Sequence, residues 1–193
     1  MRFSIQRMKK VISLRVLAFV ISVGATVFAV VGPGASAHQK IQPQGLHVEV
    51  LGVYFTPPAG AAAGIVQAID NSERDVLVQA YSFTHNAIAQ ALVRAHHRGV
   101  AVRVLLDDKS KSTNRYVIDV LTQAQMDVRY DGNHAIAHNK IMVVDESVVI
   151  TGSFNFTNSA ETRNAENFLI LKSPELARQY KANWQSHWGH AAR

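Results

Sequence analysis

The chain contains no cysteine among its 193 residues. This absence excludes disulfide bonds, zinc knuckles, other thiolate metal sites and a cysteine nucleophile. Charged residues make up only 18% and hydrophobic residues 48%, which is typical of a globular protein and argues against a disordered chain. The sequence also lacks internal repeats and low-complexity tracts, and its length fits one domain with at most a tail.

Acidic residues are missing from positions 1–37, which contain five basic residues, all within the first 15 positions. An apolar run of 16 residues follows, Val16–Val31, and then the small residues Ala35-Ser36-Ala37. This order is typical of a secretory signal peptide. We therefore predict a signal peptide over 1–37, a mature domain over 38–193 and a periplasmic or secreted location. An uncleaved membrane anchor is the alternative, although a bilayer span needs about 20 apolar residues.

The net charge of +6 depends largely on this first segment. Without residues 1–37 the chain has 15 Lys and Arg against 14 Asp and Glu, so any electrostatic attraction of a partner must be local. Lys109 and Lys111 follow a predicted strand, and in open parallel sheets such loops line the ligand crevice. We predict that they contact substrate phosphates; a solvated loop explains them equally well.

Hydrophobic patterning beyond residue 46 predicts an α/β fold. Strands alternate with helices as far as residue 130, which favours a mixed, largely parallel sheet sandwiched between helices. Thr84 or Asn86 is expected to cap the second helix, and Val50 and Trp184 are expected in the core. The predicted strands are 47–55, 75–81, 100–106, 126–130, 140–144, 147–151 and 167–172; the predicted helices are 60–71, 84–98, 115–123 and 174–188; residues 107–114 are predicted to form a polar loop.

The residues that suggest chemistry lie between His138 and Asn155. In a strand, residues two apart face the same side, so His138 and Lys140 can address one point. A hairpin around positions 145–146 brings Ser153 and Asn155 back beside them. An imidazole surrounded by an ammonium, an amide and a hydroxyl suits phosphoryl transfer, in which negative charge accumulates on phosphate oxygens.

This pattern resembles the HKD signature of the phospholipase D superfamily, and one copy is present. Within that superfamily the chain is similar to the short bacterial Nuc-type endonucleases, and the likeness extends to Ala80–Thr84, Thr151–Thr157 and Asn164–Asn167. The signature residues are His138, Lys140, Asp145, Gly152, Ser153 and Asn155, with Glu166 downstream.

The resemblance implies a covalent phosphohistidine mechanism without metal or other cofactor. The resemblance implies that His138 is the nucleophile and that Lys140 and Asn155 bind the phosphate group, assisted by Ser153. It also implies that Glu166 orients His138 through a hydrogen bond. Asp145 belongs to the same catalytic signature, with a mainly structural role. The expected activity is that of a metal-independent, non-specific endonuclease acting on DNA, with RNA as the other nucleic-acid substrate.

A single signature histidine has a further consequence. Phosphodiester hydrolysis through a covalent intermediate needs a nucleophile and a proton donor for the leaving oxygen, and the family uses two histidines. A twofold homodimer supplies the second His138, so we predict an active site shared between two chains and no stable membrane association of the mature protein.

Other functions remain open at this stage. A phospholipase D or phosphatidyl transferase would use the same residues and would carry an exposed aromatic loop, for which Phe154 and Phe156 are the candidates. A non-catalytic nucleic-acid-binding module would not need the histidine. A zinc site on a helical His134/His138 pair is disfavoured because the intervening glutamate of the H-E-x-x-H motif is missing, and the G-x-S-x-G elbow of serine hydrolases is absent from residues 152–155.

Overall fold

The computed structural model describes residues 45–58 and 60–193, so the predicted signal peptide and its cleavage site lie outside the described residues. In the described part of the chain, no helix combines the length and the hydrophobicity that a membrane crossing requires. The strands are β1 (Glu49–Thr56), β2 (Asp75–Ala80), β3 (Ala101–Asp107), β4 (Asp127–Asp131), β5 (Lys140–Val144), β6 (Val148–Gly152) and β7 (Glu166–Lys172). The α-helices are α1 (Ala61–Asp70), α2 (Asn86–His97), α3 (Lys111–Gln123), α4 (Asn158–Thr162) and α5 (Pro174–His190), with one 3-10 turn at Asp108–Ser110.

The seven strands form one mixed sheet in the order β1-β7-β6-β5-β2-β3-β4. Only the β2–β3 and β3–β4 pairs are parallel. The other four pairs are antiparallel, so the mixed α/β fold is confirmed but the expected predominance of parallel pairing is wrong. The reason lies in the second half of the chain, where the predicted hairpin of β5 and β6 inserts beside β2 and separates it from β1 and β7.

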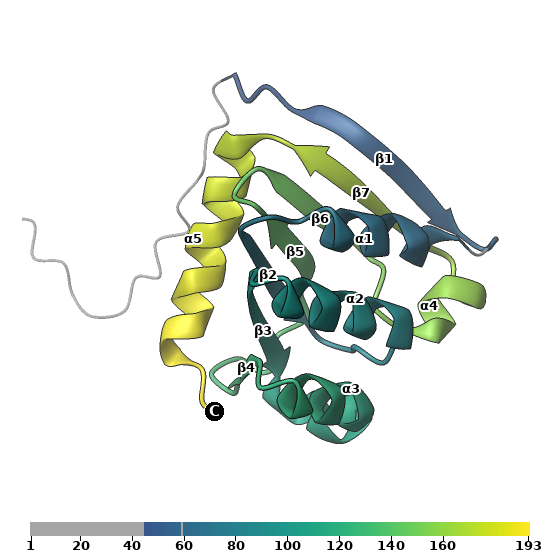
Figure 1. The fold of residues 1–193 in the computed structure, drawn as a ribbon. Coiled ribbons are helices and arrows are strands. Elements are labelled where there is room, and N and C mark those ends of the chain that lie inside the picture. Colours follow the sequence, from purple (N-terminus) through teal and green to yellow (C-terminus); the bar gives the residue numbers. More distant parts are fainter. Residues whose placement is uncertain (1–44, 59) are drawn as a thin grey trace, which may run out of the picture. The chain divides into compact units, whose positions relative to one another are not determined.

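Helices cover both faces of this sheet (Figure 1). The helices α1, α2 and α3 pack on one face, where Ile65, Leu92 and Leu121 are fully buried. The long helix α5 packs on the other face through Ala177 and Trp184. The indole N–H of Trp184 donates to the carbonyl of Val78 at 2.9 Å, which satisfies its polar atom inside the core.

Three local expectations differ from the structure. His85, and neither Thr84 nor Asn86, is the residue before α2, and its side chain makes no capping bond. The backbone N–H groups of Thr84 and His85 both bind the Phe156 carbonyl, which fixes the start of the helix. The predicted polar loop 107–114 is instead a 3-10 turn that runs directly into α3. Val50 is exposed, because β1 forms an edge of the sheet.

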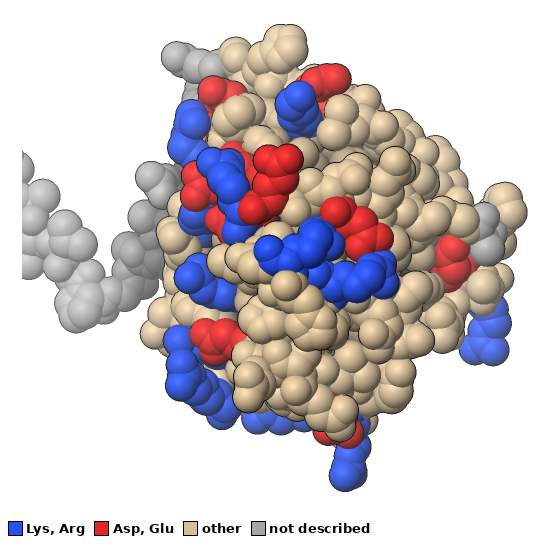
Figure 2. Space-filling view, viewed as in Figure 1, with Lys and Arg blue, Asp and Glu red and all other residues tan. Residues whose placement is uncertain are grey.

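The arrangement of strand directions gathers several chain segments at one edge of the sheet. The carboxyl ends of β2, β3, β4 and β6 meet there with the first residues of β5 and β7, as the pairs Ala80–Lys140 and Gly152–Phe168 show. On the face viewed in Figure 2, positive and negative side chains are interspersed among uncharged ones. This mixture agrees with the nearly balanced charge of residues 38–193.

Candidate active site

Five predicted catalytic side chains line one cavity at this edge of the sheet. The cavity has a volume of about 400 Å³ and is lined by His138, Lys140, Gly152, Ser153, Asn155 and Glu166. It therefore brings an imidazole, an ammonium, an amide, a hydroxyl and a carboxylate together from segments up to 28 residues apart in sequence, the distance between His138 and Glu166.

The antiparallel strands β5, β6 and β7 explain this convergence. Lys140 is the first residue of β5, Gly152 the last of β6 and Glu166 the first of β7. Antiparallel neighbours alternate in direction, so these three ends lie at the same edge. Gly152 is required there because a Cβ would overlap the backbone of Asn167 and Phe168 on the paired strand.

His138 lies in the segment that connects β4 to β5. Its ring packs against Tyr81, with ring centroids 4.7 Å apart at an angle of 56°. The backbone on either side is fixed: Ala137 donates its N–H to Asp107 Oδ1 at 2.7 Å, and the Asn139 carbonyl accepts the Tyr81 N–H at 3.0 Å. His138 is exposed, so its imidazole is accessible to a large substrate.

Lys140 is buried beneath this histidine, with only 7% of its surface exposed. Its ammonium donates to the backbone carbonyl of His138 at 2.7 Å and lies 5.5 Å from the ring centre of Tyr81. Burial lowers the pKa of Lys140, and the charge of Glu166 partly opposes that shift. The hydrogen bond to His138 holds this cation in position at the cavity, an arrangement that can stabilise negative charge with little rearrangement.

Glu166 makes contacts that differ from the expected one. Ser153 Oγ donates to one of its oxygens at 2.6 Å and Asn164 Nδ2 donates to the other at 3.0 Å. The expected hydrogen bond to His138 is therefore replaced, within one chain, by bonds that hold the carboxylate beside Ser153. Asn155 is half-buried in the same cavity, and its Oδ1 has no hydrogen-bond partner in the described part of the chain.

Asp145 lies outside the site, which corrects its inclusion among the catalytic residues. It follows β5 at the end opposite Lys140, roughly 15 Å away at about 3.3 Å per strand residue. Its carboxylate accepts the backbone N–H groups of Glu73, Arg74 and Asp75, with shortest distances of 3.0, 2.7 and 3.1 Å. Asp145 therefore fixes the β5–β6 turn to the start of β2.

Lys109 and Lys111 do not line the cavity either. The Lys109 ammonium donates to the carbonyl of Ala135 at 2.6 Å, in the segment that leads to His138. Lys111 pairs with Asp108 at 2.6 Å and lies 4.1 Å above the ring of Tyr130. Their contact with substrate phosphates stays a prediction, while the observed contact of Lys109 holds the segment that leads to His138.

Sequence reasoning missed the residues that support the reactive groups. Tyr81, Asp107 and Asn164 contact, respectively, the ring of His138, the N–H of the preceding residue and the carboxylate of Glu166. Asp107 carries a recognisable signal, because it is a carboxylate at the end of an apolar strand. The role of Tyr81 depends on strand pairing that the sequence alone does not give.

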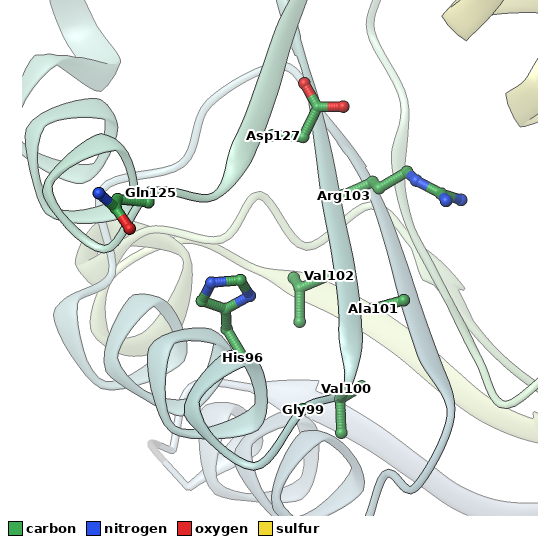
Figure 3. Close-up of a pocket in the computed structure, with 8 residues that line it drawn as sticks. All are labelled: His96, Gly99, Val100, Ala101, Val102, Arg103, Gln125 and Asp127. Atoms are coloured by element: carbon green, nitrogen blue, oxygen red, sulfur yellow. The ribbon is translucent and has the colours of Figure 1, made fainter.

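A second cavity, of about 330 Å³, lies at the opposite edge of the sheet (Figure 3). It is bounded by the first residues of β3 and β4 and by His96 of α2. Figure 3 shows the Arg103 and Asp127 side chains standing apart instead of converging with His96 on a common point. This cavity therefore offers no comparable set of reactive groups.

Comparison with known proteins gives a family match over most of the described residues. Residues 65–188 match the family described as "Cardiolipin synthase, PLD-like domain". Proteins named phospholipase D from Rickettsia prowazekii and Rickettsia conorii are 46% and 45% identical over 68% and 67% of this chain, and the matches cover 64% and 65% of their own length. The match thus spans less than two thirds of these relatives.

Solved structures show the same fold. The phospholipase D family member Nuc from Salmonella typhimurium superimposes with a TM-score of 0.72 and 34% identity, over 76% of this chain and 97% of Nuc. NucT from Helicobacter pylori superimposes with a TM-score of 0.69 and 23% identity, over 76% of this chain and 99% of NucT. With the matching domain covering most of the described residues and the signature side chains lining one cavity, the chain belongs to the phospholipase D superfamily of phosphodiesterases.

Proposed function

We propose that this protein hydrolyses phosphodiester bonds of nucleic acid as a non-specific endonuclease, with DNA as its main substrate and RNA as a second one. The convergence of His138, Lys140, Ser153, Asn155 and Glu166 on one accessible cavity carries this proposal. The cavity is open to solvent beside an exposed His138, which suits a substrate that continues beyond the reacting phosphate on both sides.

The proposed reaction has two steps. A neutral His138 attacks phosphorus, the bond to the leaving oxygen breaks, and a second, protonated imidazole gives its proton to that oxygen. Water, deprotonated by the second imidazole, then attacks the phosphohistidine and releases His138. Lys140 and the amide of Asn155 stabilise the charge on the phosphate oxygens, so the chemistry needs no metal ion at this site.

The second imidazole is proposed to be His138 of a second copy of this chain. Support comes from an exposed apolar strip on β1, where Val53 and Phe55 are 54% and 69% exposed. Thr56, the next residue, pairs with Glu166, so this strip begins beside the cavity. A dimer formed across it covers apolar surface and completes the reactive set at once.

Phospholipid hydrolysis is the second candidate, and the names of the Rickettsia relatives favour it. Against it stand Phe154 and Phe156, the residues considered for lipid contact, because both are 1% exposed and belong to the core. The likeness to Nuc over 97% of that chain supports the nuclease proposal.

The deciding experiment offers purified protein, in excess EDTA, three substrates side by side: supercoiled plasmid, RNA and a head-group-labelled phospholipid in mixed micelles. His138→Ala is the matched control. We expect nicking and degradation of the plasmid and slower or equal cleavage of RNA, with no release of head group. Release of head group without plasmid cleavage would replace the nuclease proposal by the lipid one, and binding without any turnover would leave only a nucleic-acid-binding module.

We also propose export, followed by cleavage after Ala37 and accumulation in the periplasm or medium without stable membrane association. The support is the order of charges and apolar residues in positions 1–37. Fractionation and N-terminal sequencing test it, with His38 expected as the first residue. An intact N-terminus in the membrane fraction would indicate a retained anchor.

A further inference from the structure

Three histidines converge on one buried carboxylate outside the cavity of the signature residues. Asp131 is fully buried at the end of β4, and His134, His187 and His190 surround it. His134 Nδ1 lies 3.1 Å from Asp131 Oδ2, His187 Nδ1 lies 2.6 Å from the same oxygen, and His190 Nε2 lies 3.2 Å from Oδ1. In the described part of the chain, no Lys or Arg pairs with this carboxylate.

We propose that Asp131, His134, His187 and His190 form a binding site for a divalent transition-metal ion, with Zn²⁺ as the fitting ion. Imidazole nitrogen and carboxylate oxygen are both good zinc ligands, and zinc in structural sites takes four of them at tetrahedral angles. The absence of cysteine leaves this ligand type as the one the chain offers.

The distances fit such a centre. Zinc bonds of about 2.0–2.1 Å at tetrahedral angles place neighbouring ligand atoms about 3.3 Å apart. Two of the nitrogen–oxygen separations, 3.1 and 3.2 Å, are near this value, whereas the third, 2.6 Å, is shorter. One ligand atom from each of the four residues lies within 4.8 Å of all the others. Hydrogen bonding to a shared carboxylate requires each imidazole to approach Asp131, but it does not require the three imidazoles to approach one another.

The ring arrangement shows how closely they do approach. The rings of His134 and His187 stack with centroids 4.6 Å apart, and His190 lies 5.5 Å from each of them. His187 and His190 are three residues apart on α5, which places them on one face of that helix. The side chains of His134 and His190 are 43% and 30% exposed, so an ion can enter from solvent.

A metal ion here joins two parts of the fold that are distant in sequence. His134 belongs to the segment between β4 and β5 that contains His138, whereas His187 and His190 lie in the last turns of α5. Tyr130 and Ala192 already pair through their backbones at this place, with N–O distances of 2.7 and 3.0 Å. The ion therefore fastens the end of α5 to the segment that carries the nucleophile, as a structural group that takes no part in the chemistry.

Zinc binding to the purified, chelator-treated and dialysed full-length protein tests the proposal. Titration with ZnCl₂ by calorimetry, with metal analysis, is expected to give one Zn²⁺ per chain. His134→Ala and His187→Ala are each expected to weaken binding by more than about 100-fold, since even the outer-shell partners of a metal site contribute 10- to 100-fold. The matched control His97→Ala, in an exposed histidine on α2, should bind as wild type, and so should His138→Ala.

Two further readouts separate ligation from folding. His134 is the most exposed member of the site, so His134→Ala should keep the circular dichroism spectrum of the wild type. Zinc at about 100 times its Kd should raise the Tm of the wild type by about 5 °C or more, but not that of His134→Ala. Cobalt should give the intense visible absorption of tetrahedral Co²⁺. Failure to bind stoichiometrically, wild-type affinity in both His134→Ala and His187→Ala, or loss of binding in His138→Ala would each overturn the proposal. The first two results would leave a histidine–aspartate hydrogen-bond cluster, and the last would place zinc at the active site.

Discussion

Replacement of Asp145 by alanine tests whether the third residue of the signature acts through the fold alone. The carboxylate accepts three backbone N–H groups from the Glu73–Asp75 segment, and alanine removes all three bonds. Such bonds contribute about 1 kcal/mol each, and two of the three lie in exposed positions, so we expect a loss of about 2–3 kcal/mol in the free energy of unfolding. The φ of 51° at Asp145 adds to the loss, because alanine is less tolerant of that conformation than aspartate.

For a chain of this size, that loss lowers Tm by about 4–12 °C. The assay combines urea unfolding with nuclease rates measured well below the transition. Asp145→Ala should be less stable while its kcat per folded molecule stays within about twofold of wild type, since the residue lies roughly 15 Å from Lys140 along β5. Asparagine tolerates the positive φ and keeps one acceptor oxygen, so the stability of Asp145→Asn should lie between those of the wild type and Asp145→Ala. A folded Asp145→Ala protein that is as inactive as His138→Ala would refute the structural assignment.

Four further outcomes follow from the site. His138→Ala should abolish turnover, by more than about 10³-fold, while plasmid binding by gel shift is kept; activity near wild type would exclude the covalent mechanism. Glu166→Gln should cost only about 10-fold, because its oxygens hold Ser153 and Asn164 and do not attack; a loss as large as that of His138→Ala would contradict this. Burial lowers the pKa of Lys140, so plasmid binding to the inactive His138→Ala protein, which lacks the His138 imidazoles, should be lost on the alkaline side at a lower pH than for an ordinary lysine; Lys140→Arg in the same background should move that loss upward, and an unmoved loss would refute the assignment. Mixing His138→Ala with wild-type chains should lower activity with the square of the wild-type fraction after full subunit exchange, whereas a linear fall would show that one chain suffices.

Hydrophobic periodicity was sufficient to predict most elements of the fold. The alternation through β4 and the β5–β6 hairpin are confirmed within one or two residues, except at the start of α3. The pairing of β1 with β7 was not predictable, because residues 110 or more positions apart make it and neither strand differs in pattern from its neighbours. The early start of α3 at Lys111 was missed for a related reason: its first residues are polar, and their helical state depends on Asn114, whose buried amide binds the backbone of Tyr81 and Phe83.

The candidate site, like the fold, was predictable from the sequence only in part. Spacing within 138–155 indicated which side chains meet, because a hairpin fixes its own register. The predicted hydrogen bond between Glu166 and His138 does not form within one chain. The Glu166 carboxylate instead accepts from Ser153 and Asn164, a local arrangement that no sequence rule specifies. A helical His134/His138 pair does not form, because residues 132–139 contain no helix, and His134 lies instead beside Asp131 and α5.

The position of His138 connects the proposed metal site to the proposed chemistry. Between the end of β4 and the start of β5 lie eight residues, 132–139, and they form no regular element. The contacts that hold this segment include His134 to Asp131 at its start, Lys109 to Ala135 in its middle, and Ala137 to Asp107 just before His138. A segment without the backbone hydrogen bonds of a sheet or helix depends on such side-chain contacts for its order.

Loss of metal at Asp131 should therefore loosen the start of the segment first, while the bond between Ala137 and Asp107 keeps His138 in place. Amide hydrogen exchange measured with and without Zn²⁺ should accordingly show faster exchange in 132–135 and in the last turns of α5 after metal removal, with nuclease kcat in EDTA unchanged below the unfolding transition. Equal protection of these segments in both states would mean that the ion, if bound, does not order them.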